Sequence, residues 1–421
     1  MRPLLGWLLL LVAPPPGGNA DDGGAEGPPG FYPNRPLKGR EIFDVIRNGP
    51  QGWPSHGYPS IPAPLAGWVP ADIRKGTLAA LLWLARHQSP DGSWSVRDHT
   101  RQCKEACSPH PGDGDFEAGV TGLSLLAFLG AGCTHLSRDI YDGICFGDVV
   151  RKGLRWIMSR QDTEGCIGPR NVYRYMVNHI LCATALFEAR GMTGSNLFGD
   201  QANRALDFIV AAQNPGQGWR YGARCGDSDS LVTGWAMLAL KSAEHSGLTV
   251  PRRAYDGARA WYDEVTEEAT GRVGYQSKGD GRSSLPFQAG FEPHEASTAI
   301  GAVGRMLLDR NKCDPRTWHG CDLLLKDVPK WEGSRIDFYY WHFATQALFH
   351  FDGPAGCRWK EWDKALRGTL LKNQNPAGSG CRAGSWEPVD RWSAEGGRVY
   401  ATAINALTLE VYGRIFVFGP R

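Results

Sequence analysis

Acidic residues gather at three points where a helix is expected to begin. The three groups are Asp113, Asp115 and Glu117; Asp227 and Asp229; and Glu292, His294 and Glu295. Such residues are common N-caps, and capping is one reading of all three groups. A carboxyl group that is buried, or crowded by a second carboxylate, instead keeps its proton near neutral pH and serves as an acid. The closely spaced Asp227 and Asp229 fit this pattern, with Asp229 as proton donor and Asp227 as its charge partner.

Aromatic and histidine side chains recur in the apolar segments that follow these acids. We expect a central cavity to be lined by Tyr173, Tyr175, His179, Trp235, Tyr339, Tyr340, Trp341, His342 and Tyr400. Aromatic faces stabilise cations, although the packing of a helical core gives the same pattern without a ligand. An alternative acid–base set for sugar chemistry combines His294 and Glu295 with Tyr173 or Tyr339.

Eleven cysteines are present. His99, Cys103, Cys107 and His110 have ligand types suited to zinc, but in an exported chain we favour disulfides over a metal at Cys103 and Cys107. Two further pairs, Cys313 with Cys321 and Cys357 with Cys381, are possible loop staples, whereas Cys182 is expected to be a core thiol. No metal and no other cofactor is predicted.

The N-terminal residues predict export. A charged start, a short apolar run and a small-residue stretch ending at Ala20 form a signal peptide over residues 1–20. Residues 21–70 are rich in Pro and Gly and read as a linker and an extended strap. No later stretch is long and apolar enough to cross a membrane. The net charge of +2 and the lack of a basic run give no indication of a nucleic-acid partner.

From residue 71 the chain alternates two kinds of expected helix. One set is amphipathic: 71–88, 147–161, 200–213, 251–266, about 317–328 and 360–374. The other set is apolar on nearly every side: 118–131, about 174–190, 231–246, about 294–308, 338–351 and 398–414. An all-apolar helix is buried, and one with a polar stripe faces water. The alternation predicts an all-α (α/α)6 toroid over residues 71–421, with six inner helices inside six outer ones.

A short motif repeats where the amphipathic helices end. Gln88 followed by Asp91-Gly92-Ser93-Trp94 is the fullest copy, and Gln213 recurs 52 residues after Gln161, a helix-pair period. The motif resembles the QW repeat of the squalene and oxidosqualene cyclases and of the prenyltransferase and squalene-oxidase repeat proteins. That resemblance implies the same toroid over roughly residues 71–414.

The resemblance extends to a possible site. Asp227-Ser228-Asp229-Ser230 is similar to the Asp-x-Asp-Asp acid motif of squalene-type cyclases, with Ser230 in place of the last Asp. It implies Asp229 as the acid that protonates an alkene. In the zinc prenyltransferases the order is Asp-x-Cys, which Cys225 and Asp227 reverse, so zinc is not expected here.

Three functions are open at this stage. The leading expectation is an exported toroid that binds a hydrophobic ligand or a protein partner without catalysis. The first alternative is an enzyme of terpenoid-cyclase type, and the second is a polysaccharide lyase or hydrolase.

Overall fold

The structure, a computed structural model, describes residues 69–103, 110–280, 290–291, 293–309 and 314–413. The chain forms two compact units, residues 1–36 and 37–421, and every described residue belongs to the second. The predicted signal peptide and nearly all of the predicted strap lie outside the described residues. Within the described part, no helix has the length and apolar character needed to span a membrane.

Six outer helices carry a polar face. They are α2 (Ala71–Arg86), α4 (Phe146–Ser159), α6 (Gly199–Ala212), α8 (Arg252–Val265), α10 (Pro315–Leu324) and α12 (Cys357–Leu370). In α4, for example, Val150, Leu154 and Ile157 are buried, while Arg155 on the opposite side is exposed. An apolar stripe at helical spacing drives such a helix onto the body while its charged face stays in water.

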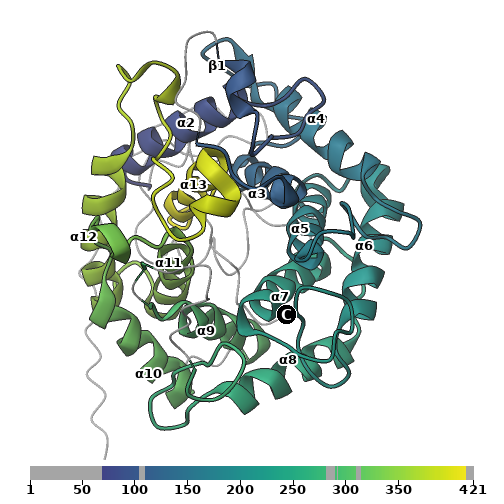
Figure 1. Cartoon of the computed structure of the whole chain (residues 1–421), viewed down its shortest axis with the longest axis vertical. Coiled ribbons are helices and arrows are strands. Elements are labelled where there is room, and N and C mark those ends of the chain that lie inside the picture. The colour runs from purple at the N-terminus through teal and green to yellow at the C-terminus, as the bar shows by residue number, and fades with distance from the viewer. Residues whose placement is uncertain (1–68, 104–109, 281–289, 292, 310–313, 414–421) are drawn as a thin grey trace, which may run out of the picture. The chain divides into compact units, whose positions relative to one another are not determined.

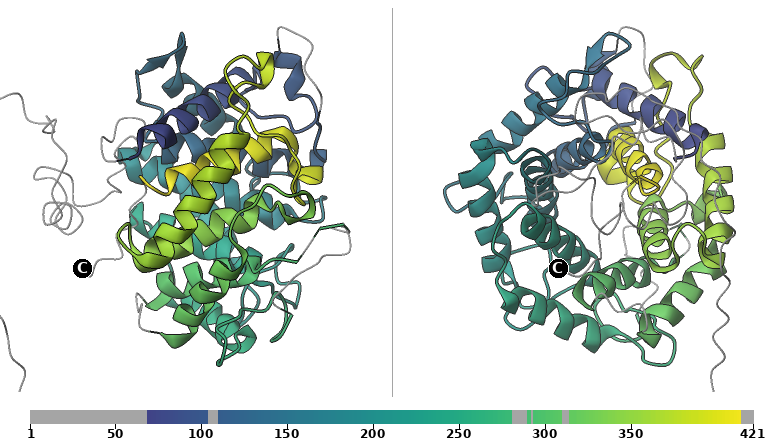
Figure 2. Two further views of the ribbon diagram at one scale, coloured as in Figure 1. Left: turned by 90° about the vertical axis from the view of Figure 1, so that its left-hand side faces the viewer. Right: turned by 180° about the vertical axis from the view of Figure 1, so that it is seen from behind.

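Six inner helices follow the outer ones in alternation. They are α3 (Glu117–Gly130), α5 (Tyr175–Thr193), α7 (Ser230–His245), α9 (Ala296–Asp309), α11 (Phe338–Asp352) and α13 (Ser393–Glu410). In α3 every residue from Ala118 to Gly130 is buried. Each inner helix contacts the next, and α13 returns to α3, which closes the ring. Figures 1 and 2 show the two concentric rings from both ends. The predicted twelve-helix toroid is confirmed for the described residues.

The remaining regular elements are short. A hairpin pairs β1 (Ile140–Tyr141) with β2 (Ile144–Cys145) in antiparallel register. Single 3-10 turns occur at His99–Gln102, Gly114–Phe116, Asn196–Phe198, Leu325–Asp327, Gly333–Arg335, Leu371–Asn373 and Gly380–Arg382.

Four repeated glutamines each link an outer helix to the next one around the ring. The Nε2 of Gln88 donates at 3.0 Å to the carbonyl of Gly92 in its own loop and at 3.0 Å to that of Val149 in α4. Gln161, Gln213 and Gln374 each donate in the same way to a loop carbonyl and to an outer-helix carbonyl. Because the second acceptor of Gln374 is Gly76 in α2, this bond joins the last outer helix to the first.

The repeated tryptophans anchor the loops to the helices before them. The indole of Trp94 donates to Leu84 O in α2 at 2.8 Å. The indoles of Trp219 and Trp386 likewise donate to a carbonyl of the outer helix before them, at 2.7 Å and 2.9 Å. All three rings are fully buried. Gly92 between Gln88 and Trp94 has φ +101°, and a Cβ there would lie 2.4 Å from Lys152 O, so the turn requires glycine.

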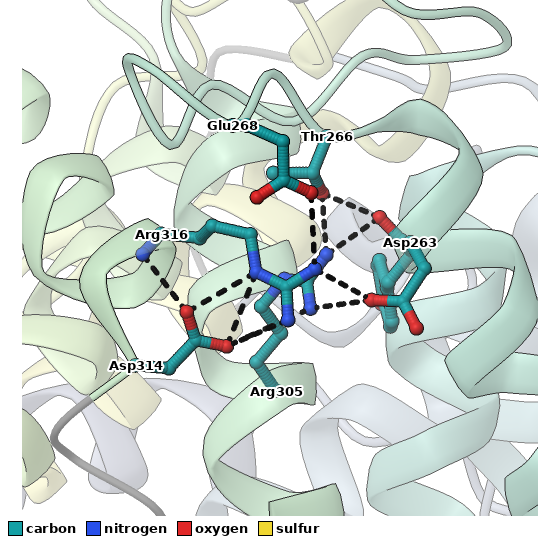
Figure 3. Close-up of polar contacts among 7 residues, drawn as sticks. Asp263, Thr266, Glu268, Arg305, Asp314 and Arg316 are labelled. Carbon is teal, nitrogen blue, oxygen red and sulfur yellow. Dashed lines mark hydrogen bonds and ion pairs between the residues drawn. The ribbon is translucent and has the colours of Figure 1, made fainter.

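A cluster of arginine ion pairs lies at the end of α8, where the fourth copy of the repeated motif has no glutamine. Thr266 occupies that position, and Arg305 from α9 donates to its hydroxyl and to Tyr262 O, both at 2.7 Å. The same guanidinium pairs with Asp263 at 3.0 Å, and Arg316 of α10 bonds both Asp263 and Asp314 (Figure 3). A buried guanidinium from the inner ring thus makes the connection between α8 and α10 that a glutamine makes elsewhere.

Candidate active site

A cavity lies inside the ring, at the end where the inner helices begin. Its lining comes from the first turns of α3, α5, α7, α11 and α13 and from the loops that precede them, and it holds about 790 Å³ of empty space, part of it open to solvent. The lining residues are Phe116, Gly119, Val120, Leu123, Arg174, Val177, Asn178, Leu181, Tyr221, Leu231, Val232, Trp235, Tyr339, Trp392, Glu395, Gly396, Tyr400 and Ile404.

The lining is almost entirely apolar and aromatic. Its two charged members among the described residues, Arg174 and Glu395, form an ion pair at 2.5 Å. The amide of Asn178 is occupied, since Oδ1 accepts from Gly119 N at 3.0 Å and Nδ2 donates to Asp115 O at 2.7 Å. The cavity therefore presents few polar groups to a ligand.

Asp229 is the buried acid beside this cavity. It precedes α7 in extended conformation, and its Oδ1 accepts the Val232 N–H at 2.7 Å. The side chain is fully buried, and Oδ2 has no hydrogen-bond partner among the described residues. Burial raises the pKa of Asp229 to about 7, so near neutrality a large fraction of the group carries its proton.

Asp229 stands directly behind the cavity wall. Its neighbours Leu231 and Val232 line the cavity. Burial and the charge of Asp229 raise the pKa values of two lining tyrosines, Tyr221 and Tyr339. The hydroxyl of Tyr221 is 2.5 Å from that of Tyr275, whose pKa burial and Asp229 also raise. The charge of Asp229 thus acts on three phenols near the cavity.

Asp227 points the other way. Its side chain is 53% exposed and pairs with Arg220. Asp227 belongs to the exposed loop before α7, whereas Asp229 is the buried residue that caps the helix, so one aspartate lies inside and the other at the surface.

His294 and Glu295 are engaged elsewhere. The Nδ1 of His294 is 2.5 Å from an oxygen of Asp327, and its ring stacks on Tyr340. Glu295 pairs with Arg272 at 2.9 Å and accepts from the Thr298 hydroxyl. Neither residue lines the cavity. His294 and Glu295 are therefore not assembled with Tyr339 as an acid–base set, because both are held by partners outside the cavity lining.

Of the nine aromatic and histidine residues expected to line the cavity, three do so: Trp235, Tyr339 and Tyr400. Tyr173 is 73% exposed, and the hydroxyl of Tyr175 accepts from Ala223 N at 2.8 Å. The Nδ1 of His179 accepts from Ile167 N at 3.0 Å. In two other repeats a threonine hydroxyl makes the same contact: Thr121 accepts from Trp94 N, and Thr233 accepts from Trp219 N. His179 therefore has a structural role in its own repeat.

The predicted lining residues 339–342 are consecutive in α11 and cannot all face inward, because successive side chains on a helix point about 100° apart. With Tyr339 at the cavity, Tyr340 turns outward and donates to Leu324 O at 3.0 Å. Trp341 packs against Trp331. His342 lies behind Trp235 with its ring stacked on it, and its nitrogens contact other side chains of the core.

Among the lining residues that the sequence did not single out are five aromatic or charged side chains: Phe116, Arg174, Tyr221, Trp392 and Glu395. All but Tyr221 lie directly before an inner helix or in its first turn. That position was the available signal.

The cysteine predictions have mixed outcomes. Cys182 is a buried core thiol that donates to Ala118 O at 3.0 Å, as expected. Cys357 carries a free thiol, so the suggested pairing with Cys381 is not formed. Cys107 and Cys313 lie outside the described residues. Where side chains are described, no three His, Cys, Asp or Glu residues are arranged to hold a metal.

The comparisons with solved structures return α/α toroids. One is the α-1,6-mannanase GH76A of Salegentibacter sp. HEL1_6, with a TM-score of 0.54 and 10% identity over 80% of this chain and 98% of that one. Another is an α-amylase from Clostridium perfringens, with a TM-score of 0.51, 11% identity and coverage of 80% and 97%. The type II terpene cyclase MstE from Scytonema gives 0.48, 16% identity, and 80% and 97% coverage.

No protein-family model and no curated protein matches the chain. At 10–11% identity these likenesses show the fold alone, which is an α/α toroid.

Proposed function

We propose that the protein is an enzyme that protonates an apolar, alkene-containing substrate of isoprenoid type in its central cavity. The proposal depends on one observation. A fully buried carboxyl group, Asp229, with an unpartnered Oδ2, stands against a cavity lined by aromatic side chains.

The surroundings of Asp229 favour a proton donor. An alkene is a weak base, so its proton donor must still hold a proton at the working pH. Burial keeps a large fraction of the Asp229 carboxyl protonated near neutrality, and its charge raises the pKa values of the lining residues Tyr221 and Tyr339. In the proposed step the Asp229 O–H bond breaks, the alkene electron pair takes the proton, and a cation forms on the neighbouring carbon.

The lining suits such a cation. Trp235, Tyr339 and Tyr400 line the cavity, and aromatic faces stabilise positive charge. A second alkene of the same substrate attacks the cation, and loss of a proton then restores a neutral product. The net reaction is an isomerisation or cyclisation without an added reagent.

A carbohydrate fits this lining poorly. Sugars carry a hydroxyl on most carbons, and burying a hydroxyl without a hydrogen bond is costly. The described polar groups of the wall are largely committed to one another, as the Arg174–Glu395 pair and the Asn178 amide show. This favours the terpenoid-cyclase alternative over lyase or hydrolase activity.

The test is turnover of linear isoprenoids in deuterated buffer. We would incubate the purified protein with farnesol, geranylgeraniol, geranylgeranic acid and squalene and analyse the products by mass spectrometry. The expected product is an isomer of its substrate that carries one deuterium delivered by Asp229. Asp229→Asn should lower turnover by on the order of 10²-fold or more, while Asp227→Asn, a matched change at the surface, should leave it unchanged. Full turnover by Asp229→Asn would refute the assignment.

We also propose that the chain is exported, on the basis of residues 1–20. Expression of the full chain in a secreting host should release a protein whose mature N-terminus is Asp21. Intact-mass analysis of the medium and of the cells decides this, and a cell-retained product that still carries Met1 would contradict it.

A further inference from the structure

A second buried carboxyl group reaches the cavity from the side of α13. Asp390 is almost completely buried, and its Oδ2 accepts from the Tyr400 hydroxyl at 3.4 Å and from Phe338 N at 3.1 Å. Its Oδ1 accepts from the Ser393 hydroxyl. Because Tyr400 lines the cavity, its phenol connects the central space to a carboxylate behind the wall.

Asp390 and Asp337 both accept backbone N–H groups at the start of α11. Asp337 is the side chain that caps α11, through Tyr340 N at 2.9 Å, and it also accepts from the Trp392 indole and pairs with the buried Arg391 at 3.1 Å. Asp390 does not cap α13, since it accepts the N–H of Phe338 at the start of α11 instead.

The hydroxyl of a further lining tyrosine has no hydrogen-bond partner among the described residues. Tyr339 is 8% exposed and lines the cavity, and its hydroxyl has no hydrogen-bond partner of ordinary geometry among the described residues. It experiences the charges of both Asp229 and Asp337. A buried phenol in this position is explained if a bound molecule or a water of the reaction completes its hydrogen bonding.

We infer that Tyr400 and Asp390 form the proton-accepting pair that ends the reaction started by Asp229. In the ring order, α7 and α13 stand opposite each other, so donor and acceptor enter the cavity from different sides. The inference rests on the proposed function, and it assigns the step that the proposal left open.

The proton balance is simple. The C–H bond beside the cationic carbon breaks, and its electron pair closes a new alkene. The proton passes to the Tyr400 oxygen while the Tyr400 O–H proton passes to the Asp390 carboxylate. Tyr400 would touch the substrate, and Asp390 acts through it.

The test is the product ratio, because proton loss follows the committed protonation step. If the pair is removed, substrate is still consumed, but water captures the cation and an alcohol replaces the alkene. For the isoprenoid of the panel that the wild type converts, Tyr400→Phe should lower the alkene-to-alcohol ratio by on the order of 10²-fold. Asp390→Asn should give the same shift, and the double variant should add nothing further, as expected of one relay.

The chain offers a matched control. Tyr412 is also a buried tyrosine whose hydroxyl donates to an aspartate, Asp363, but it does not line the cavity. Tyr412→Phe should leave the ratio unchanged. If Asp390→Asn does not fold, as a thermal melt would show, Tyr400→Phe decides alone, since it removes only a hydroxyl.

The outcomes separate the two claims. An active wild type whose product ratio is unchanged in Tyr400→Phe overturns the inference and leaves the acid role of Asp229 intact. A wild type that converts no isoprenoid overturns the proposed function, and the inference with it.

Discussion

Asp229 should make the stability of the fold depend on pH in a way that its amide replacement does not. In Asp229→Asn the amide oxygen can still accept the Val232 N–H that caps α7. The position of Oδ2, unpartnered in the wild type, receives an NH₂ group of similar size and polarity. The variant therefore resembles the protonated acid and lacks only its ability to ionise.

The size of the effect follows from the pKa values. Asp229 has a pKa of about 7 in the folded protein, against 3.8 as the reference for an exposed aspartate. Below the lower value both states are protonated and no difference arises. Between the two values the folded state holds one proton more, so the free energy of unfolding falls by about 1.4 kcal/mol per pH unit as the pH rises. Above about pH 7 the loss levels off at roughly 4 kcal/mol, which the variant does not suffer.

The assay is urea denaturation of wild type and Asp229→Asn at several pH values between 4 and 9. We expect similar stability near pH 4 and a variant that is more stable by up to about 4 kcal/mol near pH 8.5. Asp390 contributes a similar slope to both proteins and cancels in the difference. Asp227→Asn, which changes an exposed carboxylate, should follow the wild type. Parallel pH profiles for wild type and Asp229→Asn would show that Asp229 ionises normally, and the acid role would lose its physical basis.

Two further predictions concern the links between repeats. Gln213→Met removes the donor for two carbonyls and should cost about 2–4 kcal/mol in urea denaturation, whereas Gln276→Met, an exposed change, should stay within about 0.5 kcal/mol. Arg305→Met should cost about 3 kcal/mol, because it leaves the Asp263 and Thr266 groups without their buried partner. Arg253→Met on the exposed face of α8 is its control, and equal stability of the two arginine variants would refute the structural role of the cluster.

The fold could be predicted because its information is local and repeated. An amphipathic helix and an all-apolar helix differ in periodicity, and six alternations of the two leave few arrangements that bury every apolar face. The glutamine at the end of α6 and the tryptophan that follows it each bond a fixed neighbour in space. Arg305 could not be assigned to this system from sequence, because it reaches the site of the missing glutamine from a different helix.

The cavity lining could be predicted only in part. An inner helix is buried on all sides, so its sequence does not show which side faces the centre. The adjacent residues Tyr339 and Tyr340 lie in different surroundings: Tyr339 lines the cavity, and Tyr340 donates a hydrogen bond to α10. Tyr221 and Trp392 lie in loops, where no periodicity reports orientation.

Helix starts alone do not decide which carboxyl group becomes an acid. Asp229 and Asp314 both cap a helix through a backbone N–H, and capping stabilises the ionised form of each. Burial raises the pKa of both, but hydrogen bonds from Arg316 outweigh it at Asp314 and lower the pKa there. At Asp229 burial outweighs both the Val232 N–H bond and the charge of Arg220, which pairs with Asp227 at the surface, so the pKa is raised.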